Sequence, residues 1–346
     1  MHGAPIRVRV YRESDRERWE RYVLTCPQAS FFHRVGWRVV LEEVFRHRTH
    51  YLLAERGDRI AGVLPLAEVR SMLFGHALVS LPFAVYGGAA SDDVVATRAL
   101  HAHAVELACE LGVEHLELRN REALEPTWPR QNLYVSFRKT LLKDVEANLL
   151  GIPRKQRAMV RKATQRGLRS DAEGRIEDFF ALYADNQHRH GTPPHSRHYF
   201  ETLRRVFGDD CELLTVFSAQ GVAVSAVLSF YFRDEVLPYY AGDLRQAREL
   251  AANDFKYWEL MRRACERGLA VFDYGRSKRG TGSFDFKKNW GFEPTPLHYE
   301  YRLYTRQAVP QNNPASARYR ILIAAWRHLP IGVVNRIGPY VVRGLG

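Results

Sequence analysis

The segment Asn253–Phe292 reads NDFKYWELMRRACERG, then LAVFDYGRS, then KRGTGSFDFKKNWGF. Its first part has apolar residues at helical spacing, so it predicts a helix that begins with Asn253 as N-cap and closes at Gly268. Leu269–Tyr274 is short and mostly apolar, as in a strand covered on both faces. A loop rich in glycine and lysine follows. The segment therefore predicts a helix, a buried strand and a ligand-facing loop.

The same order of features occurs earlier in the chain. Ala108–Leu118 matches Ala264–Tyr274, because both contain the end of a helix, a glycine and a strand with an acid near its close. Upstream, the Gly57-Asp58 turn parallels the Gln220-Gly221 turn. We interpret the chain as two copies of one α/β unit of roughly 150 residues, although helix–Gly–strand also recurs by chance in α/β proteins. The predicted domains are 1–140 and 141–304, followed by a basic C-terminal tail, 305–346.

The net charge of +12 is concentrated in two segments. Gly151–Ser170 carries seven Lys or Arg residues and no acid, and Tyr301–Gly346 carries seven Arg residues and no acid. Such clusters favour an anionic partner, namely a phosphate-bearing substrate, tRNA or the inner face of a membrane. A solubilising surface is the alternative. Within the tail, Tyr319–His328 is predicted as a short amphipathic helix that either contacts an anionic membrane or packs back onto the domains.

Several classes of protein are disfavoured by the sequence. The cysteines are scattered without a Cys-x-x-Cys pair, which indicates reduced core residues: Cys26, Cys109, Cys211 and Cys265. His188 and His190 alone are a weak metal signal, so no metal is expected. There is no G-x-S-x-G elbow and no P-loop. A polar N-terminus and the lack of a long apolar run predict a cytoplasmic protein, with peripheral contact at the inner membrane face as an added expectation.

The loop after the strand that ends near Asp273 is the predicted reaction site, because α/β folds place ligands at the carboxyl ends of strands. Lys287 is predicted to stabilise the oxyanion that forms when an amine attacks an ester or thioester. Asp273 is the candidate proton acceptor, with strand-end hydrogen bonding as its alternative. The further predicted substrate-binding residues are Arg276 beside the loop glycines, Arg157 and Arg161 for phosphates, and Trp37, Tyr86 and Tyr240 in a cleft.

Three segments of the chain, taken together, resemble a known protein family. The segments IPRKQRAMVRKATQRGL (152–168), YYAG (239–242) and FDYGRS…GTGSFDFKKNWGF (272–292), in that order, resemble the FemAB-related acyltransferases of bacterial exopolysaccharide and PEP-CTERM sorting loci. The resemblance covers roughly residues 6–304. It implies an α/β protein of two tandem GNAT-like (acyl-CoA N-acyltransferase) domains, with mixed, mainly antiparallel sheets and substrate in the cleft between them. The family's Phe-Lys pair falls on Phe286-Lys287.

The resemblance also implies a donor substrate in place of a permanently bound cofactor, either aminoacyl-tRNA or acyl-CoA. Two departures leave the donor open. The chain lacks the long helical hairpin that some Fem enzymes use for tRNA, and in Gln246–Ala251 it has Glu249 where the GNAT pyrophosphate motif has glycine.

The expected activity is transfer of an acyl or aminoacyl group onto an amine or hydroxyl of a peptidoglycan, exopolysaccharide or other cell-envelope precursor. That acceptor is a small molecule, or a glycan or peptide precursor. A non-catalytic GNAT-derived protein that recruits partners or anionic membrane is the first alternative. An RNA-binding protein is the second, although no recognised RNA module is evident.

Overall fold

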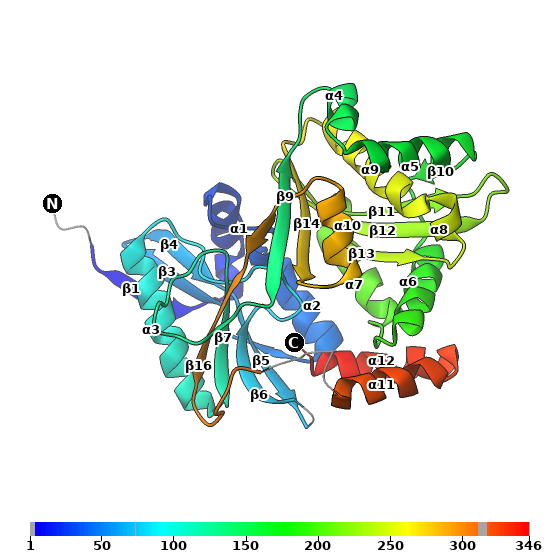
Figure 1. The fold of residues 1–346 in the computed structure, drawn as a ribbon. Helices are drawn as coiled ribbons and strands as arrows, with labels where there is room; N and C mark the ends of the chain where they lie inside the picture. The colour runs from blue at the N-terminus through cyan, green and yellow to red at the C-terminus, as the bar shows by residue number, and fades with distance from the viewer. Residues whose placement is uncertain (1–3, 73, 311–316, 346) are drawn as a thin grey trace. The chain divides into compact units, whose positions relative to one another are not determined.

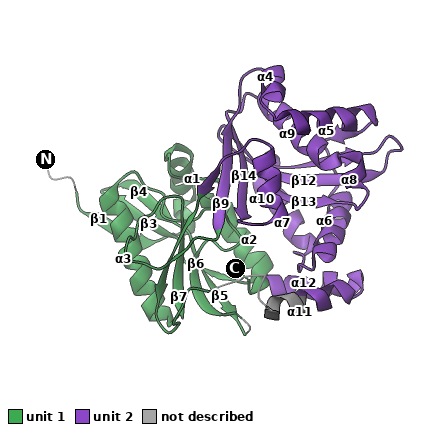
Figure 2. Ribbon diagram, in the orientation of Figure 1, with its two compact units in different colours: residues 1–133, 296–311, 343–346 green, residues 134–295, 312–342 purple. Residues whose placement is uncertain are grey.

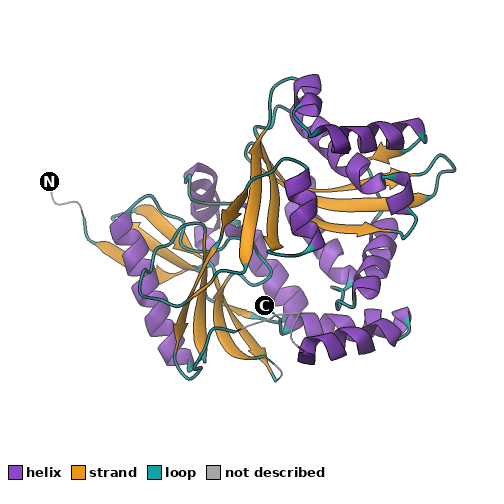
Figure 3. Ribbon diagram, in the orientation of Figure 1, coloured by secondary structure: helices purple, strands orange, loops and turns teal. Residues whose placement is uncertain are grey.

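The computed structural model describes residues 4–72, 74–310 and 317–345, with side chains of 317–322 left out. Helices are interspersed with runs of strands along the chain (Figures 1 and 3). It forms two compact units (Figure 2). Unit 1 comprises Met1–Leu133, Pro296–Gln311 and Arg343–Gly346, and unit 2 comprises Tyr134–Thr295 and Asn312–Val342.

Unit 1 contains one three-stranded and one six-stranded sheet among its described residues, in the orders β1-β3-β4 and β2-β5-β6-β7-β16-β8. Its main elements are β1 (Ile6–Val10), α1 (Arg16–Thr25), α2 (Gly36–Phe45), β2 (Arg48–Thr49), β3 (Leu52–Arg56), β4 (Arg59–Leu64), β5 (Leu66–Ser71), β6 (Gly75–Ser80), α3 (Val94–Leu111), β7 (His115–Asn120), β8 (Arg130–Gln131) and β16 (His298–Leu303).

The helix α3 joins the two parallel strands of unit 1, β6 and β7. Asp93 caps it by accepting hydrogen bonds from Val95 N and Ala96 N, and Gly112 ends it with φ 62°. Leu100 and Leu116 are fully buried in the core that α3 shares with the sheet. Each fully buried leucine contributes about 1.5–3 kcal/mol through removal of apolar area from water.

Unit 2 contains a seven-stranded sheet in the order β10-β11-β12-β13-β14-β9-β15. Its elements are β9 (Tyr134–Thr140), α4 (Val145–Leu150), α5 (Arg154–Gln165), β10 (Arg169–Asp171), α6 (Ile176–His190), α7 (Arg197–Phe207), β11 (Cys211–Phe217), β12 (Ala223–Phe232), β13 (Glu235–Asp243), α8 (Ala247–Leu250), α9 (Ala252–Glu266), β14 (Val271–Lys278), α10 (Gly282–Asn289), β15 (Pro294–Pro296), α11 (Ala317–His328) and most of α12 (Ile331–Arg343).

Unit 2 repeats the arrangement of unit 1. The helix α9 joins the parallel strands β13 and β14, and Gly268 follows the helix in a left-handed conformation. The strands β11, β12 and β13 run antiparallel in succession. The predicted α/β class, with mixed and mainly antiparallel sheets, is therefore confirmed.

Each of the two larger sheets includes a strand from the other half of the sequence. The strand β9 follows the unit 1 elements β7 and β8 in the chain, yet it pairs antiparallel with β14. Correspondingly, β16 follows the unit 2 strand β14 but pairs antiparallel with β7. The compact units therefore differ from the predicted continuous ranges 1–140 and 141–304, because two strands are exchanged between the halves.

Three predicted elements have different boundaries in the structure. The helix α9 begins after Ala251, which adopts φ 57°, so the prediction of Asn253 as N-cap was wrong: the α8 turn ends there and Asn253 lies inside the helix. The sequence pattern of residues 60–69 predicts one strand, but the structure has two, β4 and β5, separated by Pro65, which lacks an N–H for a sheet ladder. The pattern of residues 293–303 also predicts a single strand, which the structure divides into β15 and β16.

The C-terminal segment packs in part against unit 2. The helix α11 lies against α6, and Gly191 approaches Ile323 so closely that a Cβ there would lie 2.6 Å from Ile323 Cγ2. His188 Nε2 lies 2.9 Å from Leu329 O. Most of the predicted linker 310–314 lies outside the described residues. No described helix combines the length and the apolar character needed to traverse a lipid bilayer.

Candidate functional site

The parallel strands β13 and β14 diverge inside unit 2. Their ladder pairs Glu235 with Val271 and Val236 with Phe272, whereas both strands continue for several residues beyond it. On its other side, β14 has a bulge against β9, because the register shifts between Asp273 and Arg276. Gly275 within the bulge has φ 62°, a conformation that favours glycine. The bulge interrupts the regular alternation of side chains between the two faces of the sheet.

The Lys287 ammonium lies against this bulge. Nζ donates hydrogen bonds to Tyr274 O at 2.6 Å, Arg276 O at 3.1 Å and Gly275 O at 3.4 Å. It also lies 5.6 Å from the centre of the Tyr274 ring. Burial lowers the pKa of Lys287 to about 7, although the charge of Asp273 acts in the opposite direction. The Lys287 side chain can therefore gain or lose a proton near neutral pH while it contacts the carbonyl oxygens of residues 274–276.

Asp273 is placed one strand position before the bulge and is fully buried. Its Oδ2 accepts from Arg138 Nη1 at 2.6 Å, and its Oδ1 accepts from Gly275 N at 2.7 Å. The same guanidinium also pairs with Glu235. This geometry favours the structural alternative for Asp273, because its carboxylate holds the bulge and is engaged with an arginine.

The helix α10 positions Lys287. Thr281 caps it through a hydrogen bond from Phe284 N to Oγ1 at 3.4 Å. The Phe286 ring packs 5.9 Å from the ring of Trp290, which is fully buried. Trp290 Nε1 donates to Asp254 Oδ1 at 3.0 Å, and this contact ties α10 to α9. The predicted residue Phe286 therefore lies beside Lys287 as part of the packing that fixes it.

The remaining predicted residues of unit 2 lie on several elements. Arg276, also on β14, stacks 4.8 Å from the Tyr134 ring centre. The Tyr240 hydroxyl, on β13, lies 2.8 Å from that of Tyr199. Arg157 donates to Leu150 O at 3.0 Å and so closes the end of α4, whereas Arg161 is exposed on α5. Of these residues, Arg276 is the one that lies on β14, the strand that contains Asp273 and contacts Lys287.

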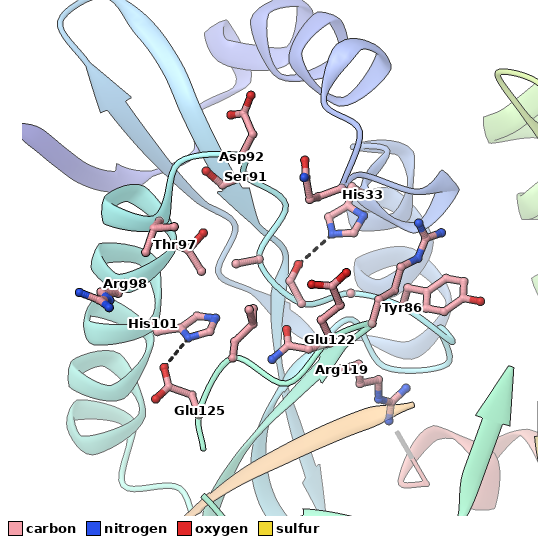
Figure 4. A pocket seen from close by; sticks show the side chains of 18 of the residues that line it. His33, Tyr86, Ser91, Asp92, Thr97, Arg98, His101, Arg119, Glu122 and Glu125 are labelled. Atoms are coloured by element: carbon pink, nitrogen blue, oxygen red, sulfur yellow. Dashed lines mark hydrogen bonds and ion pairs between the residues drawn. The ribbon is translucent and has the colours of Figure 1, made fainter. Parts of the chain in front are cut away.

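The two predicted cleft residues of unit 1 differ from each other in their surroundings. Trp37 is fully buried, and its ring lies 5.7 Å from Phe32, so it contributes to aromatic packing. Tyr86 lines a cavity of about 510 Å³ between the β6–α3 loop, α3 and the loop after β7 (Figure 4). The Arg121 guanidinium stacks on Tyr86 at 4.2 Å. This cavity was not predicted from the sequence.

The start of α9 carries carboxylates where helices often receive anions. Asp243 accepts from the fully buried Lys256 at 2.8 Å and from Ser225 Oγ. Asp254, in the first turn of α9, has its pKa raised by burial. In the preceding turn, Arg166 of α5 donates to Glu249 O. These acidic side chains disfavour a pyrophosphate at this helix end.

Comparisons with known proteins agree with the fold. The protein-family model described as "Acetyltransferase (GNAT) domain" matches residues 154–288. No curated protein matches the sequence. The crystal structure of FemX is similar, with a TM-score of 0.69 and 14% identity, over 86% of this chain and 98% of that chain.

Two further solved structures have the same fold. The C-terminal domain of a putative lysylphosphatidylglycerol synthetase from Agrobacterium fabrum matches with a TM-score of 0.57 and 12% identity, over 83% of this chain and 91% of that chain. A tandem GNAT protein from the clavulanic acid biosynthesis pathway matches with a TM-score of 0.54 and 13% identity, over 88% and 100%.

The domain match and the doubled fold define the class of the protein. Residues 154–288 match an acetyltransferase domain, and both units have the parallel strand pair joined by a helix. The chain therefore has the fold of tandem GNAT proteins.

Proposed function

We propose that this protein transfers an aminoacyl or acyl group onto an amine or hydroxyl of a cell-envelope precursor, with Lys287 at the reaction centre. The observation that carries the proposal is the enclosed Lys287 ammonium, which faces three successive carbonyl oxygens on a bulged strand. The likeness to FemX and to a lysylphosphatidylglycerol synthetase domain supports an envelope acceptor. Peptidoglycan and exopolysaccharide precursors, the latter from a PEP-CTERM locus, are the acceptor classes proposed.

The reaction needs charge stabilisation at the carbonyl under attack. When the acceptor nitrogen or oxygen bonds to the carbonyl carbon of the donor, the carbonyl oxygen becomes an oxyanion. The bond from that carbon to the donor's ester oxygen or thioester sulfur then breaks. Lys287 Nζ donates to the oxyanion in place of its longest contact, the 3.4 Å contact to Gly275 O. The departing oxygen or sulfur takes the proton that the acceptor loses. Asp273 holds the bulge during these steps.

The donor is proposed to be aminoacyl-tRNA, with acyl-CoA as the alternative. The helix α5 buries Gln156, Val160 and Ala163 and exposes Arg161 among its basic residues. Such a cationic face suits a polyanion. The carboxylates at the start of α9 oppose a CoA pyrophosphate at that point.

Contact with an anionic membrane is proposed for α12. Val334 and Gly338 are buried on one side of this helix, and a Cβ on Gly338 would lie 2.6 Å from Pro194 Cδ. On the opposite side, Val333, Ile337 and Tyr340 are exposed by 42%, 38% and 78%. Arg336 lies between them in the sequence and is exposed, and residues 301–346 contain no acid. An exposed apolar stripe with cationic neighbours suits the surface of an anionic bilayer.

The test of the transfer reaction compares Lys287→Ala with Lys288→Ala. The two residues are adjacent on α10, but Lys288 is exposed. Both proteins are assayed with charged tRNA, uncharged tRNA, acetyl-CoA and long-chain acyl-CoA at two salt concentrations, for binding and for transfer to an amine acceptor. We expect the Lys287 variant to bind the donor and to lose about 100-fold or more in turnover. Unchanged turnover would remove Lys287 from the mechanism, and absence of binding by every donor would favour the recruiting alternative.

A further inference from the structure

The cavity in unit 1 has features of a binding site of its own. Its volume of about 510 Å³ lies within the range of small-molecule pockets, roughly 300–1,000 Å³. The walls are the loop from Tyr86 to Asp92, the first turns of α3, the end of β7 with the loop after it, and part of the segment between α1 and α2 that includes His33 (Figure 4). Of the residues predicted for the transfer reaction, Tyr86 lines this cavity, whereas Lys287 and Asp273 do not.

His101 is a buried polar residue in the wall of this cavity. Its side chain extends from α3 toward the loop that carries Glu125 (Figure 4), and Nδ1 lies 2.7 Å from Glu125 Oε1. Only 4% of the residue is exposed. Nε2 has no hydrogen-bond partner among the described residues. Because the carboxylate fixes the hydrogen on Nδ1, Nε2 presents a lone pair in the neutral ring and a donor in the charged ring.

The loop that carries Glu125 is fixed by a buried carboxylate. Glu300 is fully buried, and it accepts hydrogen bonds from Leu124 N at 3.1 Å and from Glu125 N at 3.0 Å. Arg130 Nε also donates to Glu300, at 3.1 Å. The orientation of the His101–Glu125 pair is thus set before any ligand binds.

A second buried polar group lies in the same wall. Asn120 is 3% exposed, and its Nδ2 donates to Glu300 at 2.7 Å. Its Oδ1 has no partner among the described residues. Gly88 lies so close that an added Cβ would be 1.8 Å from this oxygen, so only glycine allows the loop to approach. Because Gly88 packs over the Asn120 oxygen, the buried polar atom without a partner among the described residues that remains for a ligand is His101 Nε2; such atoms are uncommon in folded proteins.

The lining of the cavity has balanced charge. Arg98, Arg119 and Arg121 are matched in number by Asp92, Glu122 and Glu125. Arg119 forms an ion pair with Glu117 at 2.7 Å, so its charge is not available to neutralise an anion. With Arg119 paired, the lining has no excess positive charge, which disfavours an anionic ligand.

We propose that this cavity binds a sugar unit without net charge. Hydroxyl groups both donate and accept hydrogen bonds, so they suit His101 Nε2, with Thr97 at half-buried depth nearby. Val94 and Leu124 offer apolar surface for the C–H faces of the ring. The proposal goes beyond the transfer reaction and does not depend on Lys287.

The experiment is saturation-transfer difference NMR with the full chain and three probes of similar size: N-acetylglucosamine, glucuronic acid and glucosamine, which are neutral, anionic and cationic. The variant His101→Phe keeps a ring but removes Nε2. Its matched control is His103→Phe, on the same helix and outside the cavity lining. Because His101→Phe leaves Glu125 without its partner, Thr97→Tyr is added: it fills the cavity from a half-buried position and leaves His101 in place.

The expected result is binding of N-acetylglucosamine in preference to both charged sugars. Binding should weaken by about tenfold in His101→Phe, the loss of one hydrogen bond at a buried site, and by at least as much in Thr97→Tyr. The 15N shift of His101 Nε2 should move when the sugar is added to the unaltered protein. Equal binding by the His101 and His103 variants, a preference for glucuronic acid, or no binding of any probe would each overturn the proposal.

Discussion

Asn120 Nδ2 and Glu300 Oε2 form a 2.7 Å hydrogen bond in unit 1, although 180 positions separate the two residues in the sequence. Glu300 lies on β16, the strand that unit 1 receives from the far end of the chain. This carboxylate joins the strand to the loop after β7, so one buried acid connects the closing of the sheet with the shape of the cavity.

Replacement of Glu300 should destabilise the protein strongly. In Glu300→Ala, the Arg130 guanidinium and the donors of Asn120, Leu124 and Glu125 lose their shared acceptor. The free energy of unfolding should fall by about 3–5 kcal/mol, the range for breaking a buried ion pair. Urea denaturation measures this change. Glu293→Ala, at an exposed position just before β15, is the control and should change it little. A small effect of Glu300→Ala would contradict the role assigned to the carboxylate.

The stability contributed by Lys287 should depend on pH. Its folded pKa of about 7 lies below the ordinary lysine value of 10.5, so the unfolded chain binds more protons between these values. Stability from this group therefore rises with pH across that window. Relative to the natural protein, Lys287→Met should gain most in stability at pH 6 and progressively less toward pH 10. A difference that is constant with pH would contradict the lowered pKa.

Turnover should follow the same ionisation. If the ammonium form of Lys287 stabilises the oxyanion, single-turnover rates should decline as pH rises through about 7. A 13C NMR titration of lysine Cε measures the ionisation directly, and its midpoint should match that of the rate. Lys288→Ala should keep the same profile. A rate profile that rises through this range would assign the neutral amine as the active form.

Asp273 is expected to act through structure. Asp273→Asn retains an oxygen for Gly275 N but loses the charge that pairs with Arg138. Turnover should therefore stay within about tenfold of the natural protein, whereas loss of a general base typically costs about 100-fold or more. Arg138→Met should be the more damaging change in thermal unfolding, because it leaves a fully buried carboxylate without its arginine. A 100-fold loss of turnover in Asp273→Asn, without a change in stability, would restore the base role.

The exposed side of α12 should govern attachment to vesicles. Sedimentation with phosphatidylglycerol vesicles should detect binding that weakens with salt, because the attraction to Arg336 is screened. The triple variant Val333→Ser, Ile337→Ser, Tyr340→Ser should lose this binding to the vesicles. A matched variant replaces three exposed apolar residues on other elements by serine, namely Val10, Leu142 and Val222. Equal loss in both variants, or binding to neutral vesicles, would contradict a specific membrane face.

The sequence predicted elements whose signals are local. Residue type indicates Asp92 or Asp93 as the cap of α3 and Gly112 as its end, and the structure has the cap at Asp93 and a left-handed Gly112. The turn at Gly57 follows from a similar local signal, and the basic segment 151–170 contains the helix α5, which begins after Pro153. Lys287 was singled out from a loop rich in glycine and lysine, and the structure places it against the β14 bulge.

Features that depend on long-range pairing were missed. Nothing local in Tyr134–Thr140 shows that β9 will pair with β14, because the pairing partner lies more than 130 residues away. His101 reads as one more residue of an amphipathic helix, and Glu300 as one acid of a strand, until the fold brings them to the same loop. A buried charged residue in an otherwise aromatic strand, Tyr299-Glu300-Tyr301, was the one signal available for the second of these.

The exchange of β9 and β16 limits how the gene can be divided. A cut between residues 140 and 141 gives an N-terminal fragment with β9 but without β16, so β7 has an open edge. The C-terminal fragment has β16 but lacks β9, so β14 is exposed in the same way. Open strand edges invite pairing with other chains. The two halves, produced separately, should aggregate, or should recover their fold only when each supplies its strand to the sheet of the other. The whole chain therefore folds as one unit that cannot be divided between the two repeats.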